Sequence, residues 1–215
     1  MQPLFRRRAE LAVKLVLLAV FLGAAAAFAV LVSYADGYEA VGEPQAQPIP
    51  FSHKHHVGDV GLDCRFCHAT VEKAAFPGMP STQTCLGCHS QLFAHAAILA
   101  ALRRSEAERK PLAWKRVHYL PDFVYFDHSI HVAKGVACVE CHGRIDQMPL
   151  VWRTEKLEMG WCLSCHRDPA PRLHPREQVF SMPAEPLPES DARLLAESLR
   201  LMDTRRLTDC STCHR

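Results

Sequence analysis

Five copies of one short pattern, C-x-x-C-H, contain all ten cysteines of the chain. Two thiols three positions apart can each form a thioether with one vinyl group of the same haem, and the histidine that follows can bind the iron. This pattern is the attachment signature of c-type haem, so it predicts five covalently bound haems. The expected attachment residues are Cys64, Cys67, Cys85, Cys88, Cys138, Cys141, Cys162, Cys165, Cys210 and Cys213, and the expected iron ligands that follow them are His68, His89, His142, His166 and His214.

Other uses of paired cysteines fit the pattern less well. Two C-x-x-C pairs could form a four-cysteine zinc site, and an even number of cysteines in an exported chain could form disulfides. Neither use needs a histidine after the second cysteine. The chain has 13 histidines in 215 residues, so five such coincidences would arise by chance roughly once in a million. A thioredoxin-like redox motif would lie near a βαβ pattern, which is not visible in the sequence.

Residues 51–89 and 126–166 have the same internal order. Each segment begins with Phe-x-His-x-x-His and continues with two attachment motifs, and corresponding residues lie about 75 positions apart. We therefore expect two copies of a two-haem module, called here the first and the second module. The fifth haem is expected at the C-terminal end.

The His-x-x-His segments supply further candidate ligands. Histidines at positions i and i+3 of a helical turn lie on one side, too close together to bind opposite faces of one porphyrin. Each would therefore bind a different haem. Surface histidines are the simpler alternative, but their place a few residues before an attachment motif, twice, favours ligation. The expected sixth ligands of four haems are His53, His56, His128 and His131.

One haem still lacks a sixth ligand. We expect His118, which lies in an aromatic, proline-bearing stretch ten residues before His128. Met159, three residues before Cys162, is the alternative, and methionine in place of histidine would raise the haem potential. The other histidines outside the motifs are His55, His95 and His174, and further methionines are Met79, Met148 and Met182.

An unbroken apolar run of 18 residues extends from Leu15 to Val32 and follows a basic N-terminal segment. Its length is at the lower limit for a membrane-spanning helix. A basic start followed by apolar and small residues also describes a cleavable secretory signal. Because the run is longer than a typical signal core, we expect a retained anchor. The basic residues would stay inside and the rest of the chain would be exported.

The remaining composition predicts a looped chain. Fifteen prolines and an aromatic content of 8% argue against a large sheet or bundle. We expect a multihaem c-type cytochrome that is mostly irregular, with short α-helices, little β-structure, a haem-filled core and one N-terminal transmembrane helix. Two longer helices are expected, at 91–108 and 190–205. The expected divisions are an anchor at 1–35, a linker at 36–50, the modules at 51–89 and 126–166, a helical connector at 90–125 and a C-terminal segment at 167–215.

Charge excludes one class of partner. Lysine and arginine number 25 and aspartate and glutamate 23, which gives a formal net charge of +2. A nucleic-acid-binding protein would carry a clustered basic excess. We expect no nucleic-acid partner.

The two modules resemble the class III multihaem cytochromes, in which a Phe-x-His-x-x-His segment precedes the first attachment motif. The stretches 117–148 and 159–169 and the terminal Leu-Thr-Asp-Cys-Ser-Thr-Cys-His resemble more closely the membrane-anchored pentahaem cytochrome subunits of bacterial alternative complex III, a quinol-oxidising respiratory complex. The resemblance covers nearly all of the chain.

That resemblance implies partners and a location. The partners would be an iron–sulfur, molybdopterin-oxidoreductase-like subunit, quinol-binding polytopic membrane subunits, and a monohaem cytochrome c or a terminal oxidase. The chain would pass once through the bacterial inner membrane, with its haem domain on the periplasmic side. It would relay electrons from quinol oxidation through five haems to that acceptor, without a substrate site or catalytic residues of its own.

Two other functions stay open from the sequence. The chain could be a small membrane-anchored quinol dehydrogenase that feeds a soluble reductase. It could also be a multihaem reductase in which one haem keeps an open iron. Eight histidines outside the attachment motifs for five sixth positions argue against an open iron.

Overall fold

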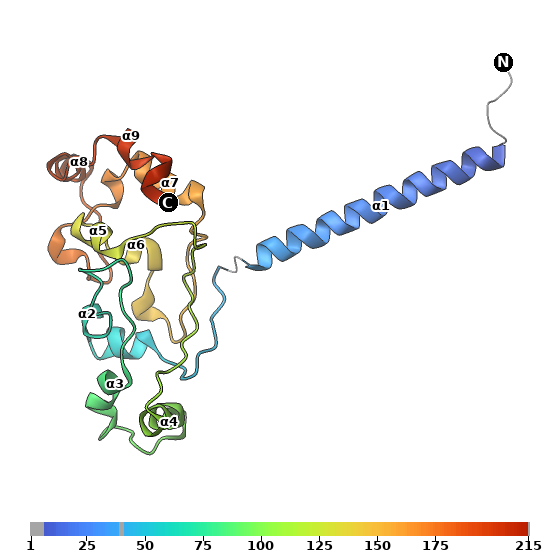
Figure 1. Cartoon of the computed structure of the whole chain (residues 1–215). Helices are drawn as coiled ribbons and strands as arrows, with labels where there is room; N and C mark the ends of the chain where they lie inside the picture. The colour runs from blue at the N-terminus through green and yellow to red at the C-terminus, as the bar shows by residue number, and fades with distance from the viewer. Residues whose placement is uncertain (1–6, 39–40, 215) are drawn as a thin grey trace. The chain divides into compact units, whose positions relative to one another are not determined.

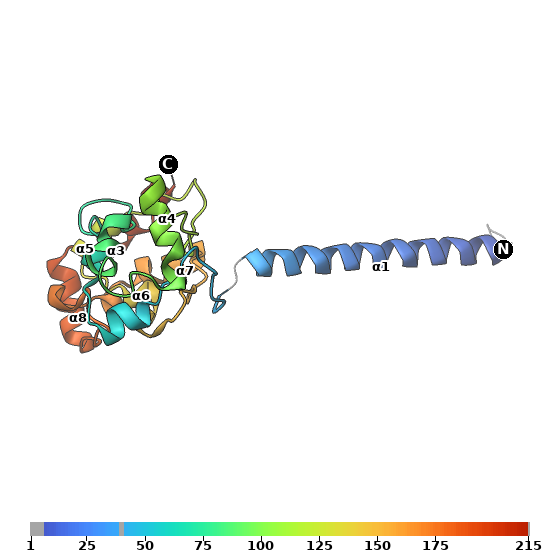
Figure 2. The same cartoon turned by 90° about the horizontal axis from the view of Figure 1, so that it is seen from below.

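The computed structural model describes residues 7–38 and 41–214, which form two compact units, Met1–Ala40 and Val41–Arg215 (Figure 1, Figure 2). The first unit is a single helix, α1, at Arg7–Tyr38. Leucine, valine and alanine dominate it and no proline interrupts it, so every residue can continue the helix. The helix includes the first three residues, 36–38, of the expected linker.

Residues Arg7–Ser33 of α1 are long and apolar enough to cross a membrane. At 1.5 Å per residue they extend about 40 Å, more than the roughly 30 Å of a bilayer's hydrocarbon core. None of the most apolar stretch is buried within the structure. A signal sequence near an N-terminus can meet the same criteria of length and composition, so α1 is a candidate span.

The second unit consists of short helices joined by irregular segments. In its described part the β-structure is limited to two isolated bridges, Val124 with His214 and Val136 with Leu173. The α-helices are α2 (Cys64–Cys67), α3 (Thr82–His89), α4 (Ala100–Glu108), α5 (His128–Ala133), α6 (Val139–His142), α7 (Met159–Arg167), α8 (Glu189–Ser198), α9 (Thr204–Leu207) and α10 (Cys210–Cys213). One turn of π-helix lies at Lys54–Asp59, and 3-10 turns lie at Ala97–Leu99, Ile145–Gln147, Ala170–Arg172 and Arg176–Gln178.

Both longer helices are shorter than expected. The segment 91–108 contains helix α4 only from Ala100, because Phe93 takes a left-handed conformation with φ of 57° and turns the chain before the helix begins. The segment 190–205 is split into α8 and α9, since Arg200 also has a φ of 57°. These two expected extents were wrong.

Buried apolar side chains are few. In the described part of the second unit twelve hydrophobic residues are buried, and eight of them form two small clusters. One cluster joins the 3-10 turn at Ala170–Arg172 to α8, and the other packs Leu102 of α4 with Ile49 and Leu99. A unit of this length normally has one larger continuous core. The clusters are Ala170, Leu173, Ala192, Ala196 and Leu201, and Ile49, Leu99 and Leu102.

Candidate haem-binding site

Each attachment motif lies on a helical turn. The backbone N–H groups of His68, His142 and His214 each donate to the carbonyl of the cysteine four residues earlier, at 2.9 Å. Such a turn places the two thiols of a motif on one side, as attachment to one porphyrin requires. No two of the ten cysteines are paired in a disulfide, and the described residues hold no cluster of three or more His, Cys, Asp or Glu side chains arranged to bind a metal ion.

The ring orientation of the attachment histidines fits iron binding. In four of the five motifs Nδ1 lies at hydrogen-bonding distance from a backbone carbonyl oxygen. Because a carbonyl can only accept, Nδ1 carries the proton and the lone pair of Nε2 is free. Metal-bound histidines generally have this arrangement. The pairs are His68 with Gly78 at 2.8 Å, His89 with Leu92 at 3.0 Å, His166 with Leu207 at 2.8 Å and His214 with Phe123 at 3.2 Å.

The two Phe-x-His-x-x-His segments have matching geometry. In each, the phenylalanine ring meets the first histidine edge-on and stacks on the second. The ring centroids are 4.9 Å apart for Phe51 and His53 and 4.8 Å for Phe126 and His128, and they are 4.4 Å apart for Phe51 and His56 and 4.5 Å for Phe126 and His131. The sequence repeat is therefore also a structural repeat.

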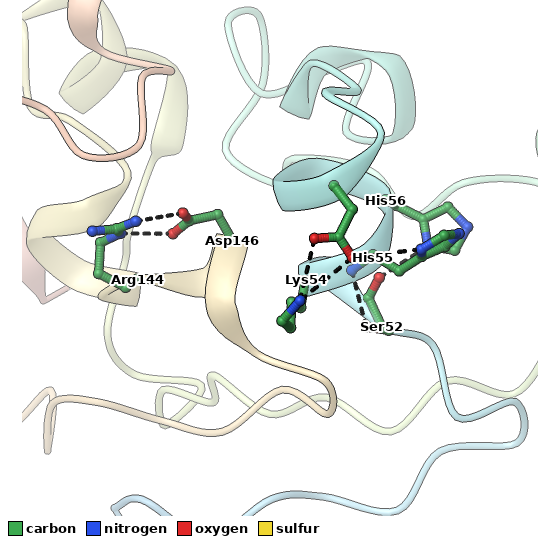
Figure 3. A network of polar contacts seen from close by, with 7 residues as sticks. Ser52, Lys54, His55, His56, Arg144 and Asp146 are labelled. Carbon is green, nitrogen blue, oxygen red and sulfur yellow. Dashed lines mark hydrogen bonds and ion pairs between the residues drawn. The ribbon is translucent and has the colours of Figure 1, made fainter.

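The second histidine of each segment is oriented by its own turn. His56 Nδ1 donates to the carbonyl of Ser52 at 2.9 Å, as Figure 3 shows, and His131 Nδ1 donates to that of Asp127 at 2.7 Å. The side chain of Asp127 also accepts a hydrogen bond from the backbone N–H of Ser129 and so caps the N-terminus of α5. Both second histidines thus also present a free Nε2.

These second histidines face the second attachment motif of their own module. The ring centroids of His56 and His89 are 6.1 Å apart, and those of His131 and His166 are also 6.1 Å apart. Two imidazoles on opposite sides of one metal ion, each bound at about 2 Å, have ring centroids about 6 Å apart. Both pairs therefore have the spacing that two axial ligands need. The sequence did not indicate this pairing, because it joins residues far apart in the chain.

The other candidate ligands gather around the first attachment motifs. His142 lies near four histidines, with ring centroids 4.2 Å from His118 and 6.4 Å from His128. Burial, followed by the positive charges that His118, His128, His68 and His53 would carry, lowers the pKa of His142 well below its usual value. Burial is also the main reason why the pKa values of His53 and His118 fall to about 4. These imidazoles are neutral at neutral pH, so their lone pairs are available.

His118 lies beside the third motif. Its Nε2 is 3.2 Å from Nδ1 of His142. The cluster of His53, His118 and His128 around His68 and His142 offers three imidazoles for two attachment sites. His53 Nδ1 is buried and has no hydrogen-bond partner among the described residues, whereas His128 Nδ1 donates to the carbonyl of Ala75 at 2.8 Å. Ligation by His118, and the haem that it serves, stay a prediction.

The fifth motif is held by the connector between the modules. Tyr125 N–H donates to the carbonyl of Cys213 at 2.6 Å, and the Phe123 ring stacks on His214 with centroids 6.0 Å apart. Met159, the alternative sixth ligand, is 66% exposed at the start of α7. The structure does not bring Met159 into a hydrogen bond or ring contact with an attachment histidine.

Three histidines have other surroundings. His174 is 2% exposed, and both its ring nitrogens are engaged, Nδ1 with the carbonyl of Glu185 at 3.1 Å and Nε2 with the carboxylate of Glu140 at 2.9 Å. Neither nitrogen is available to an iron. His55 and His95 are exposed, and His55 lies 3.7 Å from Asp59. The sequence did not indicate the partner of His174. Glu140 lies between the two cysteines of the third attachment motif, where only the cysteines and the histidine suggested a role.

Comparisons with known proteins agree with this geometry. Residues 124–215 match the family of cytochrome c7 and related cytochromes c. The chain is 35% identical over 136 residues to the multihaem cytochrome c subunit of menaquinone reductase from Nitratidesulfovibrio vulgaris strain Hildenborough. That match covers 61% of this chain and 57% of the relative, so the chain spans little more than half of the relative's length. Helical attachment turns and little β-structure in the described part fit this similarity, and over residues 124–215 the chain resembles the multihaem c-type cytochromes.

Proposed function

We propose that this chain relays electrons through five covalently bound haems as one subunit of a membrane quinone-oxidoreductase complex. A haem iron with two histidine ligands takes up and releases single electrons and leaves no position for a substrate. The observation that carries the proposal is the pair of facing imidazoles at each second motif, His56 with His89 and His131 with His166, at 6.1 Å.

The residues of the chain have three tasks in this proposal. Helical turns present the two thiols of each motif for attachment. Backbone carbonyls hold Nδ1 of the histidines, so that Nε2 points to the metal position and the ring cannot rotate. Burial keeps the clustered histidines neutral, which prevents protons from competing for the same lone pairs. The haems would also supply apolar surface for the core, of which the two small clusters provide little.

Alternative complex III is the complex that we propose. The resemblance of the motifs to its pentahaem subunit and the matched subunit of a menaquinone reductase both point to a quinone-linked assembly. We further propose that α1 is a retained anchor in the inner membrane, with the second unit on the periplasmic side. Electrons from quinol would leave toward a monohaem cytochrome c or an oxidase. The partners in the membrane would be an iron–sulfur, molybdopterin-oxidoreductase-like subunit and polytopic subunits that bind the quinol.

The relative supports a second direction of flow. That subunit belongs by name to a menaquinone reductase, so the same set of haem sites could carry electrons toward the quinone pool. The residues described above would serve either direction equally. The potentials of the haems relative to the quinone decide which direction is downhill.

Purification of the native assembly from membranes in a mild detergent tests both the five-haem relay and its place in a membrane complex. The chain should carry five haems c by pyridine haemochrome analysis, and quinol should reduce them in the intact assembly. Co-purification with iron–sulfur and polytopic subunits is expected. Isolation of the chain alone with quinol activity would contradict the complex and support a freestanding dehydrogenase. A high-spin haem or carbon monoxide binding in the native state would contradict the pure relay.

A further inference from the structure

Cysteines of different attachment motifs come near each other at one junction. The thiols of Cys64 and Cys138 lie close enough for each to shift the pKa of the other, lowering that of Cys64 and raising that of Cys138. Each is the first cysteine of the first motif in its module. The sequence places 73 residues between them, so this contact arises only from the fold.

Backbone contacts around this point are reciprocal. The loop after the first motif of the first module reaches the second module, where the backbone N–H and Nδ1 of His128 both bond to the carbonyl of Ala75, at 3.3 and 2.8 Å. The matching loop of the second module reaches the first module, where Lys54 N–H donates to the carbonyl of Met148 at 3.0 Å. The two modules are therefore joined through their first attachment sites.

A glycine makes the second of these contacts possible. The 3-10 turn at Ile145–Gln147 packs against the π-helix at Lys54–Asp59. There a Cβ on Gly58 would collide with the carbonyl oxygen of Asp146. Asp146 is held in place by two hydrogen bonds from Arg144, at 2.8 and 2.7 Å (Figure 3).

The other neighbouring attachment sites are consecutive in the sequence: the first with the second, the third with the fourth, and the fourth with the fifth. Among the cysteines close enough to influence each other electrostatically are Cys67 with Cys85, Cys141 with Cys162 and Cys165, and Cys162 with Cys213. Histidine contacts agree with this order. The turn that carries His128, near His142, also carries His131, which faces His166. His166 in turn donates to the carbonyl of Leu207, three residues before the fifth motif.

We infer that the five attachment sites follow one another in space in the order second, first, third, fourth, fifth, and not in the order of the sequence. Figure 1 shows the helices α3, α2, α6 and α7 in this succession from the lower to the upper part of the second unit. This inference rests on the proposed electron relay. It makes the second site, on α3, and the fifth site, on α10, the two ends at which electrons enter and leave.

The order can be tested with two matched variants, His68→Met and His89→Met, in the purified full-length protein. Methionine in place of histidine raises the potential of the affected haem. The altered haem is then already reduced while its neighbours titrate. Because a reduced iron carries one positive charge less than an oxidised iron, the midpoint potentials of the adjacent haems fall. A redox titration followed by electron paramagnetic resonance counts the low-spin signals whose midpoints fall. We expect one such signal for His89→Met and two for His68→Met.

The alternative order follows the sequence, and it reverses these counts. One signal for His68→Met and two for His89→Met would overturn the inference, as would equal counts. If a variant fails to bind all its haems, iron–iron distances in a high-resolution map of the wild-type protein decide instead. The distance from the first iron to the third must then be shorter than the distance from the second iron to the third. Wild-type protein without haem c would refute the proposed electron relay itself. A failure of the relay can therefore be distinguished from a failure of the spatial order.

Discussion

His56 and His89 face each other with ring centroids 6.1 Å apart, although they belong to different helices of the first module. His131 and His166 repeat this relationship at the same distance in the second module. The second histidine of each Phe-x-His-x-x-His segment is thus paired with the second attachment motif. The first histidine of each segment is directed to the cluster around His68 and His142.

Replacement of His56 by alanine should leave one haem with a single axial ligand. We expect one low-spin signal to be replaced by a high-spin signal, together with new carbon monoxide binding, in absorbance and electron paramagnetic resonance spectra. His55→Ala is the matched control, because His55 is the adjacent residue and is exposed. A complete set of low-spin signals in His56→Ala would exclude His56 as a ligand.

His118→Ala should alter the spectrum of one haem. His118 is partly buried, its pKa is lowered to about 4 mainly by burial, and its Nε2 lies 3.2 Å from His142. The exposed His95→Ala variant should leave all spectra unchanged. Unchanged low-spin signals in His118→Ala would remove this residue from the set of ligands and turn attention to Met159.

His174→Ala should lower stability without changing any haem spectrum. The substitution removes a buried ring and leaves the Glu140 carboxylate with Arg172 as its partner, at 3.3 Å. Loss of a buried hydrogen-bonded partner of a charged group costs about 2–3 kcal/mol. Denaturant unfolding measures this change, and His95→Ala is the control. A stability equal to wild type would show that Glu140 finds another partner.

Acid should destabilise the folded second unit between about pH 6.5 and pH 4. Burial is the first cause that lowers the pKa values of His53 and His118 from 6.5 to about 4. In this range the unfolded chain binds protons that the folded chain does not, so stability falls as the pH falls. The loss for each residue approaches ~3 kcal/mol at pH 4, and ligation to iron would increase it. A free energy of unfolding that stays constant from pH 7 to pH 4.5 would contradict these shifts.

Chain produced without haem attachment should lack a stable fold. Its two small clusters of buried apolar residues cannot offset the conformational entropy of the second unit. We expect a circular dichroism spectrum typical of unfolded chain for residues 41–215, and rapid hydrogen exchange. A compact, protected haem-free form would show that side chains alone supply the core.

The fold class could be predicted from the cysteine motifs, because thioether attachment to one haem requires a fixed local spacing of two cysteines and a histidine that is visible in the sequence. The extents of the longer helices did not follow. Phe93 and Arg200 have positive φ values that favour glycine, and nothing in their residue type signals a turn there. Local composition favoured helix on both sides of each position, and tertiary contacts decided where the helices begin and end.

The candidate site was predictable residue by residue but not pair by pair. The repeat identified His53, His56, His128 and His131 as candidates, since spacing alone defines such a segment. Which imidazole faces which attachment histidine depends on contacts across 14 to 35 positions, as for His118 with His142, which are 24 positions apart. Local spacing carries no information about such contacts. The hydrogen bond between Glu140 and His174 is another contact between residues far apart in the sequence.

The short bridge between Val124 and His214 has a consequence for the order in which the protein is made. Residues 123–125 precede the second module, yet their hydrogen-bonding partners are Cys213 and His214. This segment cannot reach its final position while the chain is still being synthesised. The connector at 90–125 therefore completes its assembly only after the fifth attachment motif has emerged, and a ribosome that stops early leaves this junction open and exposed to proteases.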